Sequence, residues 1–143
     1  MNWVTTAAYI IVLLYLAYTD LRERRIPNFV VLTAAGVALL EAVVVGSWFI
    51  DILGGLVGAS LFLLPRYLYG PAMAGAADVK LALFLGLWLG HPAIVGAILF
   101  AALAVSVVAL ESWLRGNYTR KATVPMAPFL ALGTFIVLAL ARV

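Results

Sequence analysis

Six long apolar segments, separated by short breaks, occupy almost the whole of this 143-residue sequence. A helix that crosses the hydrocarbon core of a bilayer needs about 20 apolar residues, and about 17 are sufficient. The segments nearest to this length cover residues 3–19, 29–45, 48–67, 77–89, 93–113 and 129–141. The pattern predicts an all-α polytopic membrane protein, a bundle of six transmembrane helices.

Composition supports the same interpretation. Hydrophobic residues make up 66% of the chain and charged residues only 10%, whereas soluble domains are about 45–50% apolar and about 25% charged. Such a chain has too little polar surface to cover its apolar side chains in water. We expect one membrane-embedded domain that comprises residues 1–143, with the lipid bilayer as its main surrounding.

The scarcity of reactive side chains narrows the possible chemistry. The absence of cysteine excludes disulfides, thiol nucleophiles and cysteine-ligated metals, and a single histidine, His91, gives no basis for a histidine metal site or a Ser-His triad. We therefore expect neither metal nor cofactor. The first segment lacks the preceding positive charges of a cleavable signal peptide, so we expect it to stay in the mature chain.

The positive charges predict the orientation in the membrane. Eight of the nine lie around the breaks after the first, third and fifth segments: Arg22, Arg24, Arg25, Arg66, Lys80, Arg115, Arg120 and Lys121. Loops rich in lysine and arginine stay in the cytoplasm, so both termini are expected on the other side. These charges report topology, and we expect no nucleic-acid partner.

Four of the six acids have ordinary explanations. Glu23 lies among the arginines of the first cytoplasmic loop, where water can solvate it. Glu111 precedes Arg115 by four residues, the spacing of a helical ion pair. Glu41 and Asp51 fall toward the outer ends of their segments, where we expect water or interfacial groups to partner them.

Asp20 and Asp78 are predicted to lie at the same membrane depth. The first segment runs inward to Asp20, and the fourth begins near Asp78 and runs outward. Two like charges at short range in a low dielectric cannot both ionise, so such a pair shares a proton. The ionised member can take a proton from water while the protonated member hydrogen-bonds the carbonyl under attack. The pair is therefore a candidate aspartyl catalytic site.

Each aspartate also has a simpler explanation. Asp20 can be an interfacial residue that pairs with Arg22 or Arg24. Asp78 can be an acid that the dipole favours at a helix start, paired with Lys80.

Three blocks of sequence, in this order and spacing, resemble the type IV prepilin peptidase family of GxGD aspartyl proteases. They are Asp-Leu-Arg-Glu-Arg-Arg-Ile-Pro-Asn at residues 20–28, Met-Ala-Gly-Ala-Ala-Asp-Val-Lys-Leu at 73–81 and Pro-Met-Ala-Pro-Phe-Leu-Ala-Leu-Gly at 125–133. The resemblance implies that Asp20 and Asp78 are the catalytic acids. It also implies a prepilin-like membrane substrate, whose leader is cut at the cytoplasmic face of the cell membrane.

Other matched residues have structural as well as functional explanations. Gly75 belongs to the motif loop, where glycine is expected to permit a backbone conformation that other residues resist. Pro27 and Asn28 are expected to break the chain and cap the second helix, and substrate contact is the alternative. Lys80 occupies the Asp-x-Lys position of the motif. Anchoring, charge balance and substrate contact are three possible roles for a lysine there.

The sequence departs from the family pattern in two ways. Ala77 replaces the second motif glycine, which adds a methyl group to the loop. Larger bacterial members carry a cysteine-rich part and methylate the new N-terminus, whereas this chain has no cysteine. It resembles the short, peptidase-only form, so we expect no methyltransferase activity.

Two other functions stay open. A small ion-coupled transporter would use its acids to bind ions, but it would place them near the bilayer midplane. A catalytically inactive pilus-assembly factor is the second alternative, which the two retained acids disfavour and Ala77 favours. The oligomeric state is left open.

Overall fold

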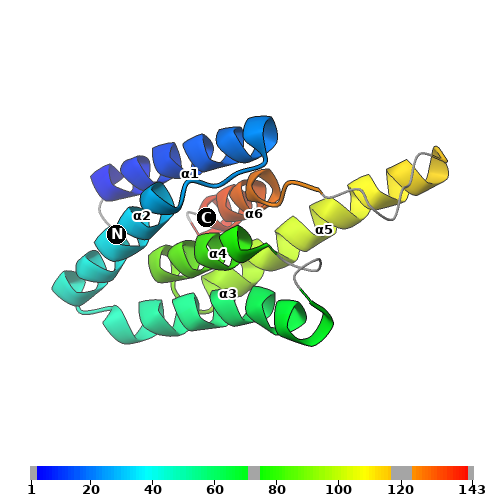
Figure 1. Ribbon diagram of the computed structural model, residues 1–143. Coiled ribbons are helices and arrows are strands. Elements are labelled where there is room, and N and C mark those ends of the chain that lie inside the picture. The colour runs from blue at the N-terminus through cyan, green and yellow to red at the C-terminus, as the bar shows by residue number, and fades with distance from the viewer. Residues whose placement is uncertain (1–2, 71–74, 117–123, 142–143) are drawn as a thin grey trace.

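The computed structural model describes residues 3–70, 75–116 and 124–141, and helices account for nearly all of them. The helices are α1 (Trp3–Glu23), α2 (Asn28–Val45), α3 (Trp48–Tyr69), α4 (Ala76–Leu89), α5 (Ala93–Leu114) and α6 (Ala127–Leu140) (Figure 1). Each begins and ends close to a predicted segment, and the largest difference is the end of α1, which runs on through Asp20 to Glu23. The all-α prediction is confirmed.

Four helices, α1, α2, α3 and α5, are long and apolar enough to cross a membrane. The other two have 14 residues each, which corresponds to about 21 Å of helix, less than the roughly 30 Å hydrocarbon core. Length therefore supports four of the six predicted spans and does not by itself support α4 and α6.

Helix α4 lies at the centre of the bundle, between α2 and α3 in the view of Figure 1, and also contacts α5 and α6. Its buried side chains include Phe84, Leu85 and Trp88. Tyr9 of α1 packs on the rings of Phe84 and Trp88, with centroid separations of 5.7 and 5.3 Å. A helix that is apolar on all sides is expected to be enclosed by protein, which explains how so short a helix is accommodated.

Glycines allow the close helix contacts. A Cβ on Gly54 of α3 would collide with the backbone of Gly86 in α4, and one on Gly86 would collide with Gly54. Likewise, a Cβ on Gly133 of α6 would collide with the backbone of Ala97 in α5. Small residues let membrane helices approach closely, and these glycines fill that packing role.

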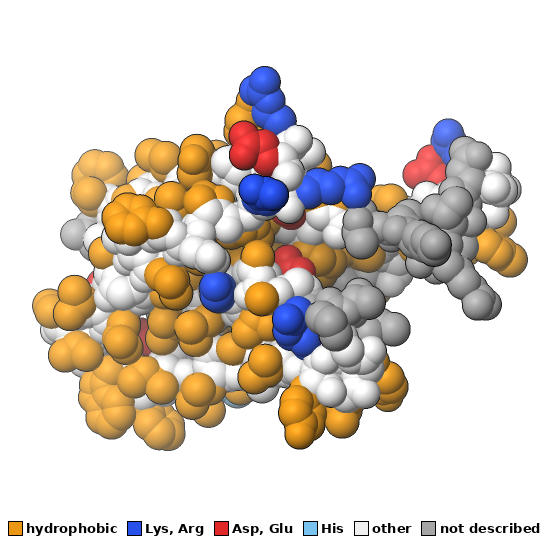
Figure 2. All heavy atoms as spheres, viewed as in Figure 1, with side chains coloured by type: hydrophobic (Ala, Val, Ile, Leu, Met, Phe, Trp, Pro, Cys, Tyr) orange, Lys and Arg blue, Asp and Glu red, His pale blue; other side chains and the backbone are white. Residues whose placement is uncertain are grey.

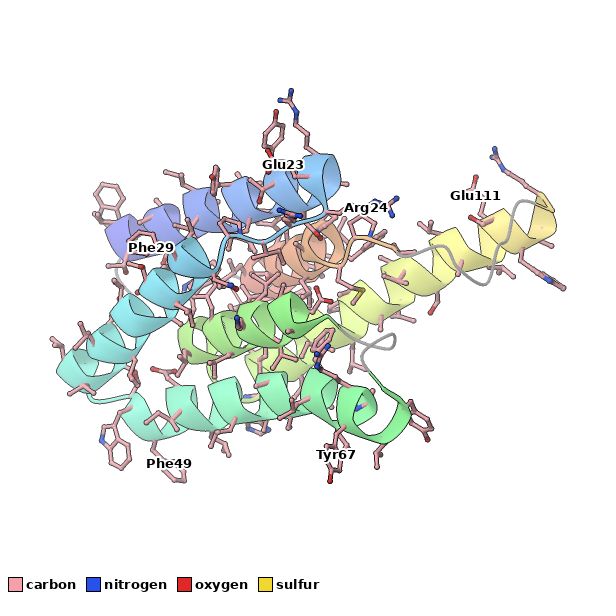
Figure 3. All side chains as sticks on the ribbon, viewed as in Figure 1. Glu23, Arg24, Phe29, Phe49, Tyr67 and Glu111 are labelled. Atoms are coloured by element: carbon pink, nitrogen blue, oxygen red, sulfur yellow. The ribbon has the colours of Figure 1, made fainter. Side chains whose placement is uncertain are left out.

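The outer surface of the bundle is largely apolar. Exposed hydrophobic side chains cover much of the face in Figure 2, and Phe29 and Val44 are 82% and 85% exposed. Phe29, Phe49 and Tyr67 point away from the helices in Figure 3. Apolar surface on this scale would drive association in water, but it suits a lipid environment. The chain has the surface of a membrane protein.

Basic side chains gather at one end of the bundle, on both sides of the breaks after α1, α3 and α5 (Figures 1 and 2). The described members of this basic end are Arg22, Arg24, Arg25, Arg66, Lys80 and Arg115. Three other cations, Arg120, Lys121 and Arg142, lie outside the described residues. The C-terminal part of α5 extends beyond the other helices on this side (Figure 1).

Candidate active site

Asp20 is buried at the end of α1, with only 7% of its surface exposed. Its Oδ2 accepts a hydrogen bond of 2.9 Å from the backbone N–H of Ala127, the first residue of α6. The first N–H groups of a helix have no partner within the helix and carry partial positive charge. The start of α6 is thus a complementary partner for the Asp20 carboxylate, 107 residues away in sequence.

Asp78 is half-buried in the first turn of α4. Its Oδ2 accepts a hydrogen bond of 3.0 Å from the backbone N–H of Gly75, the residue just before the helix. This contact is the acidic half of a capping box. The expectation that Asp78 lies at a helix start is confirmed. The ammonium of Lys80 donates its hydrogen bond to Asn28 and not to Asp78.

The expectation that Gly75 provides backbone freedom is wrong. Its φ of −66° and ψ of 145° are ordinary extended values that any residue can adopt. What glycine provides here is space, because a Cβ at this position would lie 2.8 Å from Oδ2 of Asp78. A side chain at position 75 would therefore press on the carboxylate that the backbone of the same residue holds.

Ala77, the departure from the family pattern, lies inside the first turn of α4 and packs against the core. A helical backbone does not require glycine, and alanine is the best helix former. The local geometry thus accommodates the extra methyl group.

Lys80 and Asn28 form a contact between two helix starts. The ammonium Nζ of Lys80 donates a hydrogen bond of 2.9 Å to Oδ1 of Asn28, which joins the first turns of α4 and α2. The expectation that Asn28 caps α2 with its side chain is wrong, because Pro27 occupies the cap position and no side chain caps the helix. A proline there fixes φ at a suitable value, −65°, and leaves Asn28 available for Lys80.

The two aspartates come together at the basic end. The Asp20 carboxylate is near enough to act electrostatically on Asp78. Each uses Oδ2 to accept a backbone N–H. Across the three described stretches of chain, neither Oδ1 has a hydrogen bond. One oxygen of each carboxylate is therefore anchored, and the other makes no hydrogen bond to the described residues.

The N–H of Ala127 is a contact of the candidate site that the sequence does not indicate. Residues 125–133 are part of the resemblance, but the donor is a backbone atom that no residue type reveals. Pro128, near the start of α6, is the only signal, since proline favours the first turn of a helix. Residues 71–74 of the second motif lie outside the described residues.

The remaining acids lie elsewhere. Glu41 accepts hydrogen bonds from Thr5 and Tyr9, and the Ser47 hydroxyl donates one to Asp51. The predicted pair of Glu111 with Arg115 is confirmed at 2.6 Å, on the exposed end of α5 (Figure 3). Among the described residues, no group of three or more His, Cys, Asp or Glu side chains could hold a metal ion.

Comparison with known proteins gives one family and two relatives. The model of the type IV leader peptidase family matches residues 7–110, which include both aspartates. Two relatives named prepilin leader peptidase/N-methyltransferase, from Burkholderia pseudomallei strains 1026b and K96243, are each 36% identical over 96 residues.

These 96 residues are 67% of this chain and 30% of each relative, so the chain matches less than a third of their length. No solved structure matches. Residues 125–133, which supply the N–H to Asp20, lie beyond the family match. Because the family model covers most of the sequence, the chain belongs to the type IV leader peptidase family.

Proposed function

We propose that this protein is an aspartic endopeptidase that removes the leader peptide of prepilin-like membrane proteins, with Asp20 and Asp78 as its catalytic pair. The observation that carries the proposal is the convergence of the two carboxylates at one end of the bundle. Each is anchored through Oδ2 to a backbone N–H at a helix start, and Oδ1 of each makes no hydrogen bond to the described residues. Family membership supports the same activity.

The geometry suits a water-mediated mechanism without a covalent intermediate. Two carboxylates that share a site of low dielectric do not both ionise readily, so we propose that the pair carries one proton. The ionised member removes a proton from water as the oxygen attacks the scissile carbonyl, and the protonated member hydrogen-bonds the carbonyl oxygen. When the tetrahedral intermediate collapses, the C–N bond breaks and the leaving nitrogen takes up a proton from the pair. No methyl transfer is proposed for these residues.

We place the site at the cytoplasmic face of the cell membrane. The described arginines and Lys80 lie at the end of the bundle that holds the aspartates, and positive loops stay in the cytoplasm. Both termini then lie on the opposite side, with all six helices in the membrane. The proposed substrates are pilins, pseudopilins or archaellins, whose polar leader ends where an apolar stem begins. A site at the membrane interface fits that boundary.

Leader removal tests this function directly. The chain is co-expressed with a candidate prepilin, and cleavage is followed by gel shift for wild type, Asp20→Asn and Asp78→Asn. Asparagine keeps an oxygen that can accept the backbone N–H, so membrane insertion should persist while the exchangeable proton is lost. Asp51→Asn, at the opposite end of the bundle, is the matched control. Cleavage by either active-site variant at the wild-type rate would refute the two-aspartate mechanism.

A further inference from the structure

A groove between α1 and α6 runs along the outside of the bundle and is lined only by apolar residues. Its volume is about 520 Å³, and its walls include Leu14, Pro128, Leu132 and Phe135. The floor contains two alanines, Ala17 and Ala131, which are 7% and 4% exposed. Nothing in the proposed catalytic mechanism uses this groove.

One end of the groove meets the proposed catalytic site. Ala17 lies three residues before Asp20, about one turn of α1. Pro128 follows Ala127, whose N–H donates to the Asp20 carboxylate. The far end is marked by Ala139, eleven residues beyond Pro128, or about 16 Å along α6. An apolar channel of about three helical turns therefore leads directly to a buried acid.

The shape of the groove suits a helix. Alanines on the floor allow a third backbone to approach α1 and α6 closely, as small residues do in membrane helix pairs. The larger side chains on the walls can pack against an apolar occupant without leaving a polar group unpaired. The proposed reaction also needs an apolar segment on one side of the scissile bond. The groove offers an apolar surface to that segment of the substrate, and Asp20 lies where the groove ends.

We infer that this groove receives the apolar stem of the substrate as a helix, and that stem docking selects the peptide bond presented to Asp20 and Asp78. The inference rests on the proposed peptidase function. It identifies the segment of the substrate that the protein recognises outside the catalytic pair. Lipid acyl chains are the competing occupant, and they would give the groove no role in choosing the bond.

Cross-linking tests the position of the stem. The sequence has no cysteine, so single cysteines can be introduced without background. Leu132→Cys, on the groove wall, is compared with Leu103→Cys on α5; the two leucines are 48% and 62% exposed. The partner is a prepilin with one cysteine at successive positions of its stem, in lipid nanodiscs and in an Asp78→Asn background. We expect cross-links at Leu132→Cys that recur every three to four stem positions, and none above background at Leu103→Cys.

Filling the groove tests its effect on cleavage. Ala139→Phe blocks the far end, and Ala102→Phe places the same bulk on an exposed alanine of α5. We expect Ala139→Phe to lower kcat/KM about tenfold for a full-length prepilin, because added bulk in a packed contact is unfavourable. A substrate whose stem is cut to about eight residues, or about 12 Å of helix, does not reach position 139 and should be cleaved equally by both variants.

The outcomes separate the two proposals. If wild type cleaves and Asp20→Asn does not, but Ala139→Phe behaves like Ala102→Phe and Leu132→Cys gives no specific cross-link, the groove inference is wrong and the peptidase function stands. Equal cross-linking at positions 132 and 103 would also refute it. If wild type cleaves no prepilin, both the function and the inference that rests on it fail.

Discussion

The two ends of the bundle hold carboxylates in different ways. At the end away from the basic loops, Glu41 has both oxygens occupied, Oε1 by the Thr5 hydroxyl and Oε2 by the Tyr9 hydroxyl. At the basic end, Asp20 accepts one hydrogen bond, from the backbone of Ala127. A carboxylate with both oxygens satisfied is suited to a structural role, while one that is anchored by a single oxygen can still exchange a proton. The two acids therefore differ in their hydrogen-bond partners, and this difference is the reason that we propose Asp20, and not Glu41, as a catalytic acid.

The largest expected difference in cleavage is between two single variants, each of which changes an acid at one end of the bundle to its amide. Asp20→Asn should lower kcat/KM for prepilin cleavage by about 10²- to 10⁴-fold, the usual contribution of a general acid or base. Glu41→Gln should stay within about threefold of wild type, since distant sites that share no partners act independently. It should lower the free energy of unfolding by about 1 kcal/mol, because one hydroxyl partner is lost.

Cleavage rates and thermal unfolding of both variants in the same nanodiscs measure this difference. If Glu41→Gln reduced cleavage as strongly as Asp20→Asn, the distinction between the acids at the two ends would be wrong. A proton pathway through the bundle would then be the explanation of the result.

The second effect concerns the space beside Asp78. Gly75→Ala should reduce cleavage about 10- to 100-fold, because the new Cβ would lie 2.8 Å from Oδ2 and displace the carboxylate, and a shift of about 1 Å can cost about 10²-fold. Stability should change little, since φ and ψ at this position suit alanine. Cleavage kinetics and unfolding of the same preparation separate the two effects. Wild-type kinetics in this variant would show that the spacing between Gly75 and Asp78 is not critical.

The sequence predicts the helices, and the end of the bundle at which Asp20 and Asp78 lie, better than it predicts the contacts that hold the two acids. Apolar runs locate six helices because a bilayer demands long apolar stretches, and the alternation of loops brings Asp20 and Asp78 to one end. The partner of Asp20 escapes prediction, because a backbone N–H at a helix start has no signature in residue type. The motif predicts that Gly75 permits a backbone conformation that other residues resist, whereas the structure shows that it leaves space for Oδ2 of Asp78. That space depends on a side-chain rotamer, which the sequence does not specify.

Lys80 and Asn28 illustrate the same limit. Their contact joins residues 52 apart in sequence, and nothing in either local pattern indicates it. The local signal at Asn28 favoured a helix cap, a role for which asparagine is common. Instead, the packing of α2 against α4 places the Asn28 side chain where it accepts a hydrogen bond from Lys80.

The third effect tests whether this contact positions Asp78. Asn28→Ala should reduce cleavage by a few-fold and lower stability by about 0.5–1.5 kcal/mol, the usual value of one hydrogen bond. Asn28→Asp retains an acceptor for Lys80 and should recover most of the activity. Lys80→Met alone and combined with Asn28→Ala completes a double-mutant cycle in kcat/KM. Additive losses would mean that the two side chains act independently, for example through separate substrate contacts.

The smallest effect concerns Ala77, where the family pattern has glycine. Ala77→Gly places glycine inside the first turn of α4, and a helical glycine is less stable than alanine by about 0.5–1 kcal/mol. We expect a loss of stability of this size with cleavage unchanged, because Asp78 is held by the backbone of Gly75 and not by position 77. Thermal unfolding and leader cleavage are measured on one preparation, with Ala76→Gly in the same helical turn as the control. A marked gain of cleavage in Ala77→Gly alone would mean that the extra methyl group restrains Asp78, and it would favour the alternative of a catalytically inactive pilus-assembly factor.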